Sequence, residues 1–73
     1  MEITLEDFKT GWFGLSIALT DEDIARLIQH LEQLRTSKDH FHIRNNTFEG
    51  VGGIGDVEFS WASSTTNVGY SIE

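Results

Sequence analysis

Two histidines, His40 and His42, stand two residues apart in the sequence. In an extended strand, side chains two positions apart leave the same face, so we expect both imidazoles on one face of a sheet. Such a pair holds zinc when a third ligand arrives, and Asp56 or Glu58 is available to supply it. No other ligand spacing supports a metal site, so the pattern favours a polar sheet face with neither metal nor cofactor.

Asp56 and Glu58 have the same two-residue spacing. Paired carboxylates perform general acid–base catalysis when one of them is desolvated and its pKa is raised. The sequence offers no apolar wall around this pair, and a wet sheet face desolvates neither group. The pattern therefore predicts a solvated or partner-binding acidic face without catalytic residues, and we expect the protein not to be an enzyme.

A glycine-rich segment precedes these carboxylates. Residues 50–55 match the string G-x-G-x-x-G, but phosphate binding requires a following helix whose amides face the anion. A strand pattern follows instead, which predicts a flexible or tightly turning connection. The preceding Asn45-Asn46-Thr47 fits the glycosylation sequon, and without a visible secretory signal we expect it to form a turn.

Trp12 precedes a strand pattern in opposite phase to Phe13. If Phe13 points inward, Trp12 points outward or lies at the sheet edge. An exposed tryptophan is a good interface anchor, because it buries a large area at a small entropic cost. A tryptophan that caps the end of the core is the other interpretation, and both stay open.

The net charge of the chain limits the classes of partner that it can bind. The chain of 73 residues carries 12 acidic and 5 basic side chains, a net charge of −7 with neutral histidines. Such a domain repels nucleic-acid phosphates and anionic lipid and attracts basic proteins. No signal peptide or spanning apolar run is visible, so we expect a cytoplasmic protein. With no cysteine, a single domain over residues 1–73 must depend on its core alone.

Hydrophobic periodicity predicts the elements that position these side chains. Alternation of period two predicts strands at 2–6, 13–19, 40–44, 56–61 and 68–72. Thr20 and Asp23 form a capping box, and the following apolar residues recur at helical spacing: Ile24, Leu27, Ile28, Leu31 and Leu34. We expect an α+β fold, with a single antiparallel sheet of about five strands (ββαβββ) and one amphipathic helix packed on one face. About 20 apolar side chains are expected to form the core.

Three of these stretches occur in a characteristic order. The acidic-capped helix starts at Thr20-Asp21-Glu22-Asp23, and Asp39-His40-Phe41-His42-Ile43 and Gly53-Ile54-Gly55-Asp56-Val57-Glu58-Phe59 follow it. A short helix, a D-H-x-H strand and a G-x-G-D-[IV]-E-F strand resemble the small immunity proteins of bacterial polymorphic toxin systems, most closely immunity protein family thirty-two. The similarity covers residues 13–61.

The resemblance implies a non-enzymatic cytoplasmic protein that binds a cognate toxin domain and blocks its active site or substrate access. We predict that His40, His42, Asp56, Glu58 and Trp12 contact the toxin, and that the carboxylates pair with its Arg or Lys side chains. The protein is then a monomer or weak homodimer. Two alternatives stay open: a self-associating assembly module that pairs through sheet edges, and a small metal-binding protein or metal-dependent hydrolase that uses the two histidines.

Overall fold

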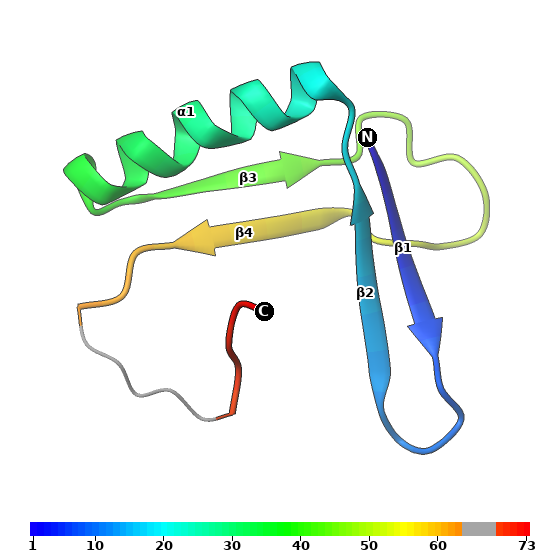
Figure 1. The fold of residues 1–73 in the computed structure, drawn as a ribbon. Coiled ribbons are helices and arrows are strands. Elements are labelled where there is room, and N and C mark those ends of the chain that lie inside the picture. The colour runs from blue at the N-terminus through cyan, green and yellow to red at the C-terminus, as the bar shows by residue number, and fades with distance from the viewer. Residues whose placement is uncertain (64–68) are drawn as a thin grey trace.

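The computed structural model describes residues 1–63 and 69–73, and this part of the chain contains four strands and one helix (Figure 1). Their order is β1 (Glu2–Asp7), β2 (Phe13–Ala18), α1 (Asp21–Ser37), β3 (His40–Arg44) and β4 (Asp56–Ser60). β1 pairs with β2 and β3 pairs with β4, both antiparallel. The α+β class, the helix and the first four predicted strands are therefore confirmed.

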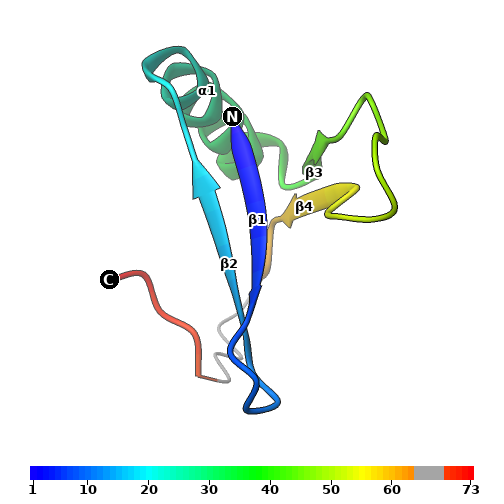
Figure 2. The same ribbon diagram turned by 90° about the vertical axis from the view of Figure 1, so that its right-hand side faces the viewer.

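The prediction of one five-stranded sheet is wrong. The described residues form two separate two-stranded sheets in the order ββαββ. The two hairpins run in different directions (Figures 1 and 2), and no ladder joins them within the described residues. Alternation determines the two faces of a strand but not which strands pair. Of the fifth predicted strand, residues 69–72 form no strand, and Val68 lies outside the described residues.

The register of hairpin β1–β2 places its apolar residues on one face. Ile3 lies opposite Ile17, and Leu5 lies opposite Leu15. The isoleucine pair is half-buried, whereas the leucine pair, farther along the hairpin, is exposed. The alternation predicted which face is apolar, but only one end of that face is covered.

A short turn joins β1 to β2. Asp7 Oδ1 accepts a hydrogen bond from the Lys9 backbone N–H, and the Phe8 N–H donates to the Trp12 carbonyl. The Phe8 ring folds over Gly14, where a Cβ atom would lie 2.6 Å from the ring. Glycine at this position therefore lets the ring approach the strand.

The predicted capping box of α1 is confirmed. Thr20 Oγ1 accepts from the Asp23 N–H, and Asp23 Oδ2 accepts from the Thr20 N–H, both at 3.1 Å. The Met1 amine lies 3.0 Å from the same carboxylate and ties the start of β1 to the helix. The hydrogen bonds that the Asp23 carboxylate accepts lower its pKa. The largest contribution comes from the Thr20 backbone N–H, and the next comes from the Met1 amine. At the other end, Lys38 adopts a left-handed conformation and its N–H donates to the Leu34 carbonyl.

Helix α1 packs along β3 (Figure 1). The Phe41 ring stacks on Phe59 of β4 with centroids 5.0 Å apart, and His30 of the helix contacts Phe41 at 5.2 Å. Lys38 Nζ lies 4.5 Å from the centre of the Trp61 ring, beyond the end of β4. No helix in the described residues has the length and apolar character needed to cross a membrane.

The expected core of about 20 side chains is wrong, because no side chain in the described residues is fully buried. The chain exposes 6670 Å², whereas a compact protein of 8.2 kDa exposes about 4,500 Å². Its radius of gyration is 14.3 Å, against about 11 Å for a compact chain of this length. One helix and two narrow hairpins do not enclose an interior, so the apolar residues in the described part of the chain are at most half-buried.

Candidate functional site

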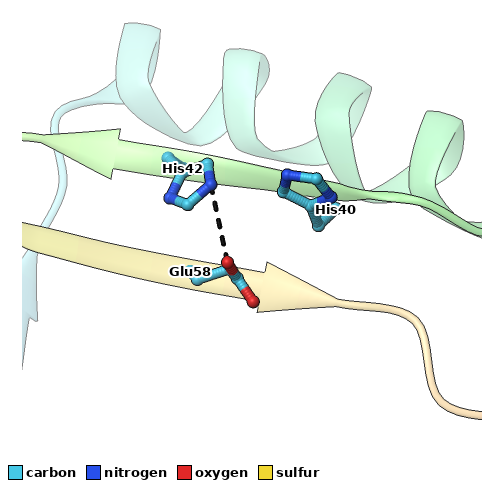
Figure 3. Close-up of side chains that lie close together, drawn as sticks. All are labelled: His40, His42 and Glu58. Atoms are coloured by element: carbon cyan, nitrogen blue, oxygen red, sulfur yellow. Dashed lines mark ion pairs between the residues drawn. The ribbon is translucent and has the colours of Figure 1, made fainter.

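The candidate site lies on the face of hairpin β3–β4 that points away from α1. His42 of β3 lies opposite Glu58 of β4, and His40 and Asp56 occupy the neighbouring positions on the same face. Figure 3 shows the two imidazoles side by side along β3, with the Glu58 carboxylate close to His42. We call His40, His42, Asp56 and Glu58 the histidine–carboxylate face.

His42 is the central side chain of this face. Its Nδ1 atom lies 3.0 Å from both carboxylate oxygens of Asp56, and its Nε2 atom lies 3.5 Å from Glu58 Oε1. Arg44 Nε approaches Asp56 Oδ1 at 3.5 Å. Both nitrogens of the His42 ring therefore face carboxylate oxygens from β4.

His40 and Glu58 have further polar neighbours. His40 Nδ1 lies 2.7 Å from Asp39 Oδ1, and the His40 ring meets the His42 ring edge-on with centroids 5.1 Å apart. The Ser60 hydroxyl donates to Glu58 Oε2 at 2.6 Å. These contacts hold the side chains in defined orientations on an open surface.

Solvent exposure limits what the histidine–carboxylate face can do chemically. The side chains of Glu58 and Asp56 are 52% and 46% exposed, and that of His42 is 22% exposed. Exposed ion pairs of this kind contribute about 0–1 kcal/mol to stability, so they do little to hold the fold. A carboxylate acts as a general acid at neutral pH only when desolvation raises its pKa, and Asp56 and Glu58 are both about half exposed. The arrangement suits recognition of a cation or of a positively charged surface.

The sequence correctly predicted that His40 and His42 share one face of a strand and that Asp56 and Glu58 do so on another strand, but it missed Asp39. Residues 39 and 40 are adjacent, and adjacent residues of a strand point to opposite faces. Asp39 lies just before β3 begins, so its side chain is free to turn toward His40. The D-H pair in the sequence is the only signal for this contact.

Trp12 is not part of this face. It lies in the turn between β1 and β2, on the other hairpin. This turn is at the end of its hairpin far from β3 and β4 (Figures 1 and 2). Trp12 is 74% exposed, so the core-capping interpretation is wrong. Phe13 is 59% exposed as well, so the condition that Phe13 points inward is not met. Contact of these five residues with a partner stays a prediction.

A second feature is an uncovered apolar surface that the sequence analysis assigned to the core. Leu5, Phe13 and Leu15 share one face of hairpin β1–β2 and are each more than half exposed; we call them the apolar hairpin face. On α1, Ile24, Ile28 and Leu31 are also exposed. Periodicity identifies an apolar face but carries no information on what covers it. The one sequence feature that indicates incomplete burial is the short length of the chain.

The loop between β3 and β4 has the predicted turn. Asn45 Oδ1 accepts hydrogen bonds from the backbone N–H groups of Thr47 and Phe48. The glycine-rich part of the loop lines an open pocket of about 290 Å³. β4 begins directly after this part of the loop, at Asp56. The predicted connection is confirmed, because a strand and not a helix N-terminus follows the glycines.

Comparisons with protein-family models, curated proteins and solved structures find no match to this chain. The resemblance to immunity proteins therefore rests on the three sequence motifs.

Proposed function

We propose that this chain is an immunity protein that neutralises a cognate bacterial toxin domain by direct stoichiometric binding and has no catalytic activity of its own. The observation that carries the proposal is the uncovered surface. The chain exposes 6670 Å², about 2,200 Å² more than a compact protein of its mass. Surface in this excess is available for a partner to cover.

The size of this excess suits a protein partner. A standard protein–protein interface covers about 800 Å² on each partner, and obligate interfaces cover more. The apolar hairpin face supplies the kind of surface found at the centre of such interfaces, and Trp12 at the adjoining turn supplies an aromatic anchor. Burial of the exposed leucines and Phe13 by a partner supports tight binding.

Charge complementarity favours a basic toxin domain over a second copy. The net charge is −7, so two copies repel each other, whereas a basic domain is attracted and its association is accelerated. On the histidine–carboxylate face, Asp56 and Glu58 are placed to pair with Arg or Lys side chains of the toxin. Such pairing covers the toxin surface that contacts its substrate.

One observation favours a second candidate function, self-association. Each of the four described strands belongs to a two-stranded sheet, so each has one edge outside any ladder. Unpaired edges are templates for strands of another copy. Under this alternative, the mass measured by light scattering rises with concentration without any partner.

The proposed function is tested with the product of the gene adjacent to this one, expressed as a toxin in a sensitive host. Co-expression of the chain is expected to restore growth, and the two proteins are expected to form a one-to-one complex in calorimetry. The Asp56→Lys/Glu58→Lys variant is expected to lose protection. Glu2→Lys/Glu6→Lys is the matched control, because it makes the same charge change on β1 and is expected to protect. Full protection by the first variant would refute the proposed surface, and the absence of both rescue and complex would refute the function.

A further inference from the structure

We infer that His40, His42 and Glu58 form a zinc-binding site that links β3 to β4. Each of the three residues offers one ligand atom, and these three atoms lie within 4.8 Å of one another (Figure 3). Two imidazole nitrogens and one carboxylate oxygen are a donor set that zinc binds in proteins, with a fourth position left for water.

The distances approach those of a tetrahedral zinc centre. Two ligand atoms about 2.1 Å from a tetrahedral zinc ion lie about 3.4 Å from each other. His42 Nε2 and Glu58 Oε1 are already 3.5 Å apart. The remaining ligand atom comes from His40, whose side chain is half exposed. It lies no more than 4.8 Å from the other two, so a movement of roughly 1.5 Å brings it to tetrahedral spacing. Because half of the His40 side chain is exposed, a rotation about its χ angles supplies this movement.

A second set of contacts orients the ligands. His42 Nδ1 lies 3.0 Å from Asp56, and His40 Nδ1 lies 2.7 Å from Asp39. In the tautomer that donates from Nδ1, the Nε2 lone pair of His42 is available to the metal on the side of Glu58, and Nε2 of His40 is left as the acceptor nitrogen of that ring. The Ser60 hydroxyl engages Glu58 Oε2 and leaves Oε1 for the metal. Carboxylate–histidine pairs of this type accompany the ligands of protein zinc sites, where they fix the tautomer and raise ligand basicity.

The carboxylates around the two imidazoles and the pairing of β3 with β4 indicate what a bound ion would do. Three carboxylates, Asp39, Asp56 and Glu58, surround the two imidazoles, and a divalent cation relieves their mutual repulsion. A two-stranded sheet is only marginally stable by itself. An ion held by β3 and β4 together binds the paired strands more tightly than the unfolded chain, so it stabilises this hairpin.

The test uses zinc chloride alone and the tag-free full-length chain, observed by NMR of its three imidazole rings. The His40 and His42 signals are expected to shift and to saturate at one equivalent of zinc. His30 lies on α1 against Phe41, so its signal is expected to stay in place and serves as an internal control. Equal shifts at all three histidines, or shifts that never saturate, would overturn the inference.

Variants measured by calorimetry separate a built site from adventitious binding. Asp56→Asn is expected to weaken zinc affinity roughly 10-fold, because partners behind the ligands typically contribute 10–100-fold. Glu58→Gln is expected to weaken it further. Glu6→Gln removes an exposed carboxylate of β1 and is expected to bind like the wild type. Wild-type affinity in Glu58→Gln would refute the site. No toxin is present, so the result is independent of the proposed function.

Discussion

Replacing Phe59 and Leu15 one at a time separates the apolar residues that hold the fold from those left for a partner. Phe59 is half-buried and stacks on Phe41 at 5.0 Å, whereas Leu15 is 53% exposed. We expect Phe59→Ala to lower the free energy of unfolding much more than Leu15→Ala does, although both residues lie on apolar strand faces.

The two magnitudes follow from the burial of each side chain. A fully buried Phe→Ala change costs about 3–5 kcal/mol. Partial burial reduces this cost to about 2–3 kcal/mol, in which the stacked ring pair contributes about 0.5–1.5 kcal/mol. Complete burial of a leucine contributes about 1.5–3 kcal/mol. With half of its surface in water in the native state, Leu15→Ala is expected to cost about 1 kcal/mol.

The assay is urea unfolding of both variants, followed by circular dichroism at several protein concentrations. Phe59→Leu provides a milder change if Phe59→Ala does not fold. An equal loss of unfolding free energy in Phe59→Ala and Leu15→Ala, or a larger loss in Leu15→Ala, would refute the reasoning. If the loss of unfolding free energy in Leu15→Ala grows with protein concentration, a second copy of the chain covers the apolar hairpin face. With the toxin added, Leu15→Ala is expected to weaken the complex.

Three further predictions concern the helix cap, acid stability and size. Thr20→Ala removes the cap hydroxyl that accepts from Asp23 and is expected to cost about 1 kcal/mol, measured by thermal unfolding; an unchanged midpoint would contradict the capping box. The folded-state pKa of Asp23 is lowered from 3.8, so its contribution to stability is complete above that unfolded-state value and is lost as the pH falls through the lower folded-state pKa. Asp23→Asn is therefore expected to reduce stability at neutral pH and to weaken its dependence on pH below 4; a wild-type acid profile would contradict this. Small-angle scattering of the dilute chain is expected to give a radius of gyration close to 14.3 Å, and a value near 11 Å, that of a compact chain, would mean that the hairpins close on each other.

Local interactions explain which predictions were accurate. The capping box depends on Thr20 and Asp23, three residues apart, and the turn at Asn45 depends on amides two and three residues away. Contacts of this range are encoded in a short segment, so their residues can be recognised without the fold. The shared face of His40 and His42 follows in the same way from the period of a strand.

The candidate site required one more step. Alternation placed Asp56 and Glu58 on one face of a strand, but the pairing that sets His42 opposite Glu58 joins residues separated by the whole loop. Asp39 could not be assigned from strand spacing, because it precedes β3 and its side chain turns toward His40. The sequence therefore predicted the members of the histidine–carboxylate face but not their distances or partners.

The sequence by itself determined the helix, the first four strands, the apolar side of each strand and the acidic character of the chain. These properties follow from side-chain type and from spacings within a few residues. Only the tertiary structure decided that the strands form two sheets and that Leu5, Phe13 and Leu15 stay exposed. The physical reason is that pairing and burial depend on the free energies of contacts between distant segments, and the period of a single segment does not contain them.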